Sequence, residues 1–130
     1  MGTPSQNNLS LIVNAQDANG VNFINRVVGA IGYQGIVGQY LDGVLTTTGS
    51  TSLTLPTATA LQVYIKNTSA TAGITIGATP SSGSSGPIGK LGPGSVYTYW
   101  SMTTAASLGF TAMTLTADTA GATFELFLGG

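Results

Sequence analysis

The stretch Met113-Thr-Leu-Thr-Ala-Asp-Thr-Ala-Gly-Ala-Thr-Phe-Glu-Leu-Phe-Leu128 carries the clearest structural signal in the chain. Apolar side chains occupy every second position on both sides of a short polar turn: Met113, Leu115 and Ala117 before it, and Phe124, Leu126 and Leu128 after it. Such alternation is typical of β-strands that bury one face and leave the other in water. Residues 111 to 128 are therefore predicted to form a β-hairpin with its turn at residues 117 to 121.

The same period of two recurs upstream. Leu61, Val63 and Ile65 alternate with more polar residues, which predicts a half-solvated strand. A turn over residues 67 to 72 and a short return strand over residues 73 to 77 are expected to follow. Gly92-Pro93-Gly94 predicts a type II turn, because proline fixes φ and the glycine after it accepts a positive φ. That turn leads into a strand over residues 95 to 100.

Two dipeptides in the first half are strong hairpin signals. Asn19-Gly20 and Asp42-Gly43 each lie between extended apolar segments, and glycine adopts the positive φ of a tight turn at little cost. Hairpins are predicted at both. The glycine-rich segment 29 to 38 is predicted to be a bulged or bent strand, with a membrane-active, fusion-peptide-like segment as the alternative.

The remaining segments are short or polar. Residues 78 to 87 are rich in glycine and serine, which predicts an exposed, mobile loop. Residues 103 to 109 allow one helical turn at most. About nine or ten strands at regular spacing predict an all-β fold, a single antiparallel β-sandwich or a jelly-roll-like barrel. We expect an extended N-terminal arm over residues 1 to 8 and one β-sandwich domain over residues 9 to 130.

Charge is scarce in this sequence. The 130 residues include 3 Lys and Arg, 4 Asp and Glu, and neither histidine nor cysteine. Charged residues make up 5% of the chain, against about a quarter in a typical soluble domain. A surface of uncharged polar and apolar groups opposes association poorly, so we expect a subunit that works in an assembled, oligomeric state. Three scattered basic residues predict no nucleic-acid binding, and no membrane-spanning or secretory segment is expected.

The groups that active sites use are almost absent. Without histidine there is no Ser-His-Asp triad, and three of the four acids, Asp17, Asp42 and Asp118, lie in turn sequences where aspartate caps the backbone. Glu125 is expected to face outward. We therefore predict no enzymatic activity, no catalytic residues, no cofactor and no metal site within one chain. A cation bound between subunits, with ligands from several chains, is the alternative.

Six residues are candidates for an interface. Thr3, Pro4, Gln6 and Asn7 belong to the arm, which would lie on a neighbouring subunit or, alternatively, along its own domain. Tyr97 and Tyr99 belong to the one aromatic cluster, and rings with a polar tip are enriched at interfaces. We expect these two tyrosines to face away from Trp100 and to form a contact surface. Sugar stacking on them is an alternative.

The order of several segments resembles that of small β-rich virion structural proteins of tailed bacteriophages, over roughly residues 51 to 130. These segments are Leu53-Thr-Leu-Pro56, Val63-Tyr-Ile-Lys-Asn67, Ile74-Thr-Ile-Gly77, Leu91-Gly-Pro-Gly-Ser-Val96 and Phe124-Glu-Leu-Phe-Leu-Gly-Gly130. The resemblance implies a non-enzymatic head decoration or cement protein, made in the host cytoplasm and located in the virion. Its partners would be the major capsid protein, copies of itself, or both. A small coat protein, a neck or tail component, and a receptor- or glycan-binding module are the alternatives.

Overall fold

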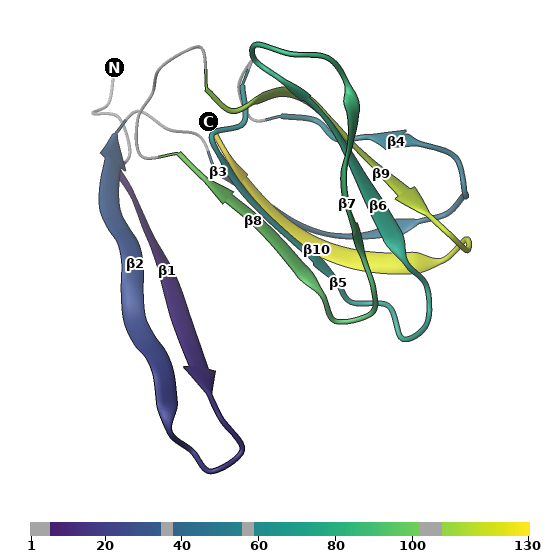
Figure 1. The fold of residues 1–130 in the computed structure, drawn as a ribbon. Coiled ribbons are helices and arrows are strands. Elements are labelled where there is room, and N and C mark those ends of the chain that lie inside the picture. The colour runs from purple at the N-terminus through teal and green to yellow at the C-terminus, as the bar shows by residue number, and fades with distance from the viewer. Residues whose placement is uncertain (1–5, 35–37, 56–58, 102–107) are drawn as a thin grey trace. The chain divides into compact units, whose positions relative to one another are not determined.

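The computed structural model describes residues 6–34, 38–55, 59–101 and 108–130 (Figure 1). All regular structure in these residues is β, with no helix among them. The chain divides into two compact units, Met1–Ile36 and Val37–Gly130. This division differs from the predicted one, which separated residues 1 to 8 from residues 9 to 130.

The first unit contains one antiparallel hairpin, in which β1 (Gln6–Gln16) pairs with β2 (Asn22–Gln34). Gly20 has a φ of 81°, so the hairpin predicted at Asn19-Gly20 is confirmed. The carboxylate of Asp17 accepts hydrogen bonds of 2.9 Å from the backbone N–H groups of Asn19 and Val21. Asp17 therefore caps the turn, as its sequence position predicted.

A bulge interrupts this hairpin where the glycine-rich segment begins. Leu9 is opposite Ile31 and Leu11 is opposite Val28, so two residues of β2 face one residue of β1. The expected bulged strand is confirmed at Gly29 and Ala30. Residues 35 to 37 of that segment lie outside the described residues, as do residues 1 to 5 of the predicted arm. Residues 6 to 8 of the arm begin β1.

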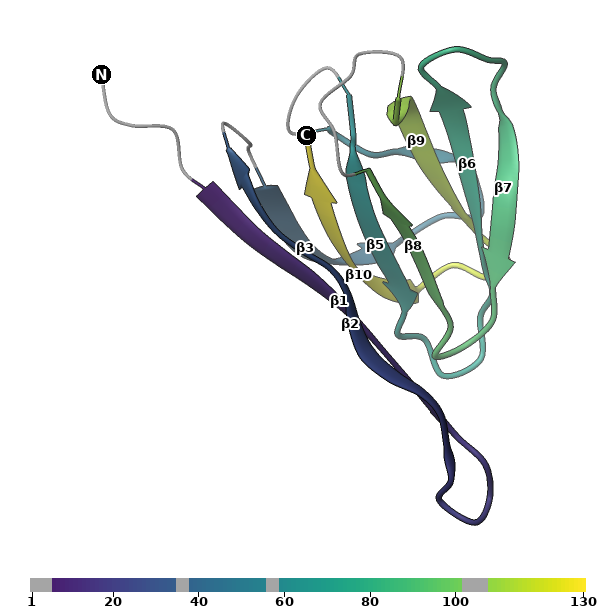
Figure 2. The ribbon, with the colours of Figure 1, turned by 60° about the vertical axis from the view of Figure 1, so that its left-hand side comes forward.

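The second unit is a β-sandwich, so the predicted fold class is confirmed. Figure 2 shows its two sheets as separate layers. Its described strands are β3 (Gly38–Leu45), β4 (Thr51–Ser52), β5 (Gln62–Asn67), β6 (Ile74–Pro80), β7 (Gly86–Leu91), β8 (Val96–Trp100), β9 (Phe110–Ala117) and β10 (Ala122–Gly129). One sheet has the order β3-β10-β5-β8 and the other β4-β9-β6-β7. Each described sheet has two free edges, so the barrel alternative does not apply.

The strand pairs of the sandwich are nested in the manner of a jelly roll. The first strand pairs with the last, β3 with β10, and β4, β5 and β6 then pair with β9, β8 and β7 in turn. All these pairs are antiparallel. This order is what results when one long hairpin folds over into two sheets, the arrangement of jelly rolls.

The core lies between the two sheets and is formed by alternate residues of their strands. In β5, β6, β9 and β10 buried positions alternate with partly exposed ones. The largest fully buried apolar side chains are Leu45, Val63, Ile65, Ile74, Ile76, Met113, Leu115, Leu126 and Leu128. The faces predicted for residues 61 to 65 and 113 to 128 are thus confirmed.

Two predicted hairpins are wrong. Asp42 and Gly43 lie inside the continuous strand β3, which pairs with β10 along its whole length. β9 and β10 are joined by a turn at the predicted place, but they belong to different sheets. The turn is an arch across the core, because the buried faces of both strands point into the same interior.

Other predictions of turns and loops are confirmed in full or in part. Gly94 has a φ of 78°, which confirms a glycine in positive φ after Pro93. The predicted loop 78 to 87 is shorter in the structure, because β6 continues to Pro80 and β7 begins at Gly86. The return strand after β5 exists as β6, although it lies in the opposite sheet. The possible helical turn at residues 103 to 109 falls mostly outside the described residues.

Candidate interaction surfaces

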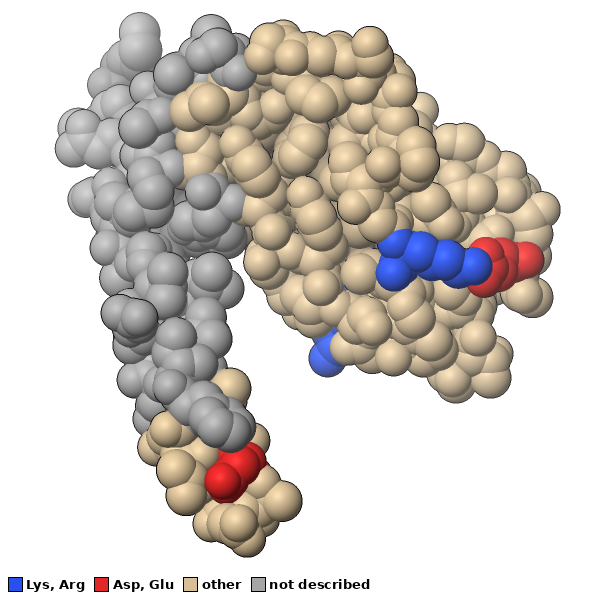
Figure 3. Space-filling model, viewed as in Figure 1, with Lys and Arg blue, Asp and Glu red and all other residues tan. Residues whose placement is uncertain are grey.

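The described surface carries few charges. Figure 3 shows one face of the molecule, where one adjacent pair of blue and red patches and a smaller, separate blue patch lie among uncharged residues of the sandwich. Lys90 Nζ and Asp118 Oδ2 form an ion pair of 2.9 Å, and both side chains are about half exposed. Such exposed pairs contribute little stability, about 0 to 1 kcal/mol. Asp118 thus pairs with a lysine in addition to lying in a turn.

A cluster of tyrosines and carboxylates lies on the outer face of the β3-β10-β5-β8 sheet. Glu125 on β10 is directly opposite Asp42 on β3 and Lys66 on β5. One step along the strands, Phe127 is opposite Tyr40 and Tyr64. Residues that face each other across antiparallel strands lie on the same face, so the fold brings together acids that are far apart in sequence.

Hydrogen bonds hold this cluster together. Tyr64 Oη donates to Glu125 Oε1 at 2.6 Å, and Tyr40 Oη lies 3.3 Å from Glu125 Oε2 and 3.1 Å from Asp42 Oδ1. The hydrogen bond to Glu125 is the main reason that the pKa of Tyr64 is raised to about 12. The pKa of Tyr40 is also raised, chiefly by its hydrogen bond to Asp42.

The hydrogen bonds that raise the pKa values of the tyrosines lower the pKa of Glu125. The hydrogen bond from Tyr64 lowers the pKa of Glu125, although partial desolvation opposes this. A carboxylate with a lowered pKa is ionised at neutral pH and accepts hydrogen bonds, whereas a general acid needs a raised pKa. The cluster is suited to holding tyrosine rings in place. Asp42, predicted to cap a turn, in fact accepts from Tyr40 in the middle of a strand.

The strand β3 also exposes apolar side chains. Tyr40 is 61% exposed, Val44 56% and Leu41 41%. β3 is an edge strand, and β10 is its partner in the described sheet. Sequence reasoning missed this edge because Asp42-Gly43 predicted a turn there. The aromatic and branched residues around that dipeptide were the signal that favoured a strand.

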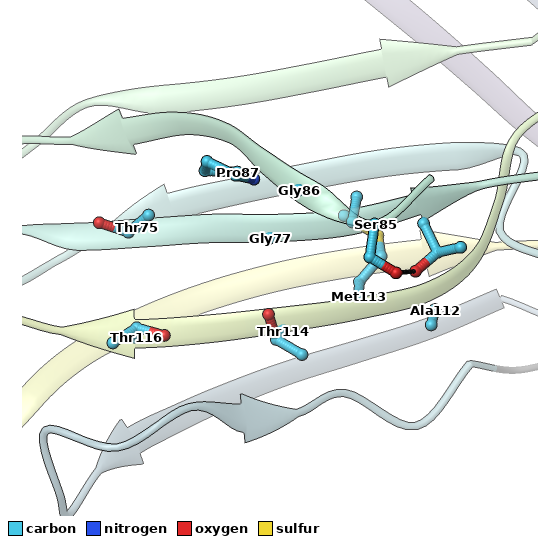
Figure 4. A pocket seen from close by; sticks show the side chains of 11 residues that line it. Thr75, Gly77, Ser85, Gly86, Pro87, Ala112, Met113, Thr114 and Thr116 are labelled. Atoms are coloured by element: carbon cyan, nitrogen blue, oxygen red, sulfur yellow. Dashed lines mark hydrogen bonds between the residues drawn. The ribbon is translucent and has the colours of Figure 1, made fainter. Parts of the chain in front are cut away.

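A shallow groove of about 350 Å³ lies on the outer face of the other sheet. Figure 4 shows Thr75, Thr114 and Thr116 along neighbouring strands β6 and β9, with Ser85, Gly86 and Pro87 at one side. Thr79 Oγ1 and Ser85 Oγ are hydrogen-bonded at 2.7 Å across that side. The groove therefore offers hydroxyl groups and carries no charged side chain in its lining.

Gly77 lies in the groove between these threonines. A Cβ added there would lie 2.5 Å from Thr114 Oγ1 and 3.9 Å from the backbone oxygen of Gly86. A side chain at this position would displace the Thr114 hydroxyl, so the glycine lets that hydroxyl lie close to the backbone of β6. Part of the glycine- and serine-rich segment that predicted an exposed loop forms the side of this groove.

The predicted tyrosine surface is arranged differently from the expectation. Tyr97 and Tyr99 are half-buried and pack against the core, and Tyr99 makes an edge-to-face contact with Phe110 at a centroid distance of 4.9 Å. Burial raises the pKa of Tyr97. Among residues 96 to 99 of β8, Val96 and Thr98 are exposed. The two tyrosines therefore stabilise the sandwich in the single chain, and their role in an interface stays a prediction.

The structure describes two of the four interface candidates in the arm. Thr3 and Pro4 lie outside the described residues, and Gln6 and Asn7 belong to β1, where they are opposite Gln34 and Tyr33. Among the described residues there is no group of three or more histidine, cysteine, aspartate or glutamate side chains that could hold a metal ion. The described part of the chain also contains no helix that is long and apolar enough to cross a membrane.

Comparison of the chain with protein-family models, with curated proteins and with solved structures found no match.

Proposed function

We propose that this chain is a non-enzymatic structural protein of a virus particle, which decorates or cements a phage capsid through contacts between subunits. The observation that carries the proposal is a β-sandwich with almost no surface charge and an exposed apolar sheet edge at Tyr40, Leu41 and Val44. Uncharged surfaces can be buried against other subunits without removing ions from water.

Two further observations support the proposal. The nested strand order is that of jelly rolls, an architecture that viral capsid proteins also have. The acids of the described surface occupy structural positions, in a turn, in an ion pair or bound to tyrosines. Neither observation requires chemistry at this surface.

The test is the copy number of the chain in purified virus particles from the source of this sequence, by quantitative mass spectrometry against the major coat protein. A number comparable to that of the coat is expected for a decoration or coat protein. Mild chaotrope should release a decoration protein while the shell stays closed, whereas removal of a coat protein would open the shell. A small, ring-sized number would assign the chain to the neck or tail, and absence from particles would overturn the proposal.

A glycan-binding module is the second candidate, because the groove around Gly77 is uncharged and lined by hydroxyl groups. A few polar groups orient the ligand in binding sites of about this size, and threonine and serine hydroxyls can donate hydrogen bonds to, and accept them from, the hydroxyls of a neutral sugar. The test is NMR titration of the chain with neutral mono- and oligosaccharides, with Thr114→Val as the variant and Thr98→Val on the opposite sheet as the control. Specific shifts that Thr114→Val abolishes and Thr98→Val preserves would establish this function. Absence of any shift would exclude it.

A further inference from the structure

In the described sheet, the edge of β3 that faces away from β10 can pair with a further strand. The backbone of an edge strand presents a row of N–H and C=O groups that a further strand can pair with. Proteins usually protect such edges with prolines, bulges or several charges, but β3 is eight residues long with Asp42 as its one charged residue. Its pairing with β10 runs without a register shift. Tyr40, Leu41 and Val44 add exposed apolar area along it.

The exposed ring of Tyr40 is also held in position. Its hydroxyl is within hydrogen-bonding distance of both Asp42 and Glu125. A ring fixed before binding loses little conformational freedom when a partner covers it, and such rings contribute strongly at interfaces. The β3 edge, defined here as residues 40 to 45, is thus a preorganised surface.

The hairpin of the first unit offers a strand of matching chemistry. Its described sheet has two strands, β1 and β2, and two strands alone are marginally stable in water. Arg26 is the one charged residue of β2. An antiparallel register that sets Arg26 opposite Asp42 also sets Ile24 opposite Val44 and Val28 opposite Tyr40. At these three alternate positions a pair of opposite charges lies between two apolar pairs, which is the pattern that stabilises paired strands.

We propose that the β3 edge of one copy pairs antiparallel with β2 of a second copy, in the register Arg26–Asp42, and so joins neighbouring subunits by a continuous sheet. The inference rests on the proposed function in that the chain works in an assembled state, and it names the partner and the surface. Pairing of β3 with β3 about Asp42 is disfavoured, because it would set two carboxylates opposite each other.

The first experiment is sedimentation velocity of the full chain over a range of concentrations. Val44→Lys places a charge on the β3 edge, and Val96→Lys is the matched control on the opposite edge of the same sheet, where the valine is 48% exposed against 56% for Val44. We expect Val44→Lys to weaken self-association by roughly tenfold or more, and Val96→Lys to leave it unchanged. Equal effects of the two variants, or a chain that is monomeric at every concentration, would overturn the inference.

The second experiment establishes which strands meet. The chain contains no cysteine, so two differently tagged copies carrying Ile24→Cys and Val44→Cys can form disulfides only at the introduced sites. We expect a cross-link between the two copies, and none when Ile24→Cys is mixed with Val96→Cys. Cross-links confined to pairs of Val44→Cys copies would indicate β3–β3 pairing and overturn the inference. A chain that carries both cysteines and forms only an intramolecular disulfide would also overturn the inference.

These outcomes are distinguishable from failure of the proposed function. Cross-linked copies of a chain that is absent from virus particles would sustain the β3–β2 contact and reject the capsid role. A chain that is abundant in particles, and whose incorporation and self-association both ignore Val44→Lys, would sustain the capsid role and reject the contact.

Discussion

Gly43 lies in the middle of β3, opposite the buried Phe124 of β10. A Cβ at this position would lie 2.8 Å from Cε1 of the phenylalanine ring, so the glycine makes room for the aromatic side chain. We expect Gly43→Ala to reduce the free energy of unfolding by roughly 1–3 kcal/mol, the usual cost of overpacking a core. Urea denaturation followed by fluorescence measures the change.

Gly89→Ala is the control for that variant. Gly89 also lies in a strand, but an added Cβ there would meet no atom within 4 Å. The free energy of unfolding of Gly89→Ala should therefore stay within about 0.5 kcal/mol of the parent value. If Gly43→Ala is as stable as Gly89→Ala, the ring of Phe124 does not require the glycine.

The shifted pKa values of Tyr64 and Glu125 predict how the stability of the fold depends on pH. The raised pKa of Tyr64, about 12, means that the folded chain holds this proton more tightly than the unfolded chain, with its ordinary value of 10.0. The stabilisation is therefore complete below pH 10 and is lost as the pH rises toward 12. Glu125 has a lowered pKa, so its contribution is present above its ordinary value of 4.5 and is lost as the pH falls through the lower, folded value.

The variant Tyr64→Phe tests both directions. Without the phenol, the Glu125 pKa should rise toward its ordinary value, which NMR titration of the carboxyl carbon detects. The loss of stability between pH 10 and 12 should become smaller in the variant. Tyr97→Phe is the control for the Glu125 titration, because the causes that shift the Glu125 pKa are contacts with Tyr64, Tyr40 and Lys66 and do not include Tyr97. An unchanged Glu125 titration in Tyr64→Phe would contradict the assignment.

Asn67, at the end of β5, connects elements of both sheets. Its side chain is fully buried, and Nδ2 donates to the backbone oxygens of Ala72 and Leu91 at 2.7 and 2.9 Å. Aspartate cannot donate these bonds and would bring a buried charge. We expect Asn67→Asp to lower the free energy of unfolding by roughly 3 kcal/mol or more. Thermal and urea unfolding at neutral pH measure this loss.

The same change at an exposed asparagine is its control. Asn19 lies in the turn between β1 and β2 with its side chain exposed, and aspartate suits turns as well as asparagine does. Asn19→Asp should therefore be neutral within about 0.5 kcal/mol. A similarly small effect of Asn67→Asp would mean that the amide does not hold the sheets together.

At the scale of whole elements, sequence periodicity and strand pairing are separate problems. The alternation in residues 113 to 128 correctly predicted two strands, their buried faces and the turn between them. It wrongly predicted that the strands pair with each other. A hairpin and an arch bury the same alternate residues, and the difference depends on strands β3, β5 and β6, which are distant in sequence.

For the whole molecule, the division at Ile36 and Val37 predicts that the sandwich folds by itself. All residues of the main core cluster belong to Val37–Gly130. We expect a chain of residues 37–130 to show β-type circular dichroism, dispersed NMR spectra and one cooperative unfolding transition. It should also lose self-association if β2 is the strand that joins copies. An unfolded fragment would show that the hairpin is required for the sandwich.

The local pattern of the sequence was sufficient for the all-β class, for the inward faces of β5, β9 and β10, and for the turns at Gly20 and Gly94. These features depend on period-two alternation and on the φ that glycine permits, both of which are properties of neighbouring residues. The tertiary structure alone decided the nested strand order, the role of Gly43, the inward position of Tyr97 and Tyr99, and the exposed β3 edge. Each of these features depends on which strands, distant in sequence, pack around the same core. Alternation determines which face of a strand is buried, but it does not determine which strands pair.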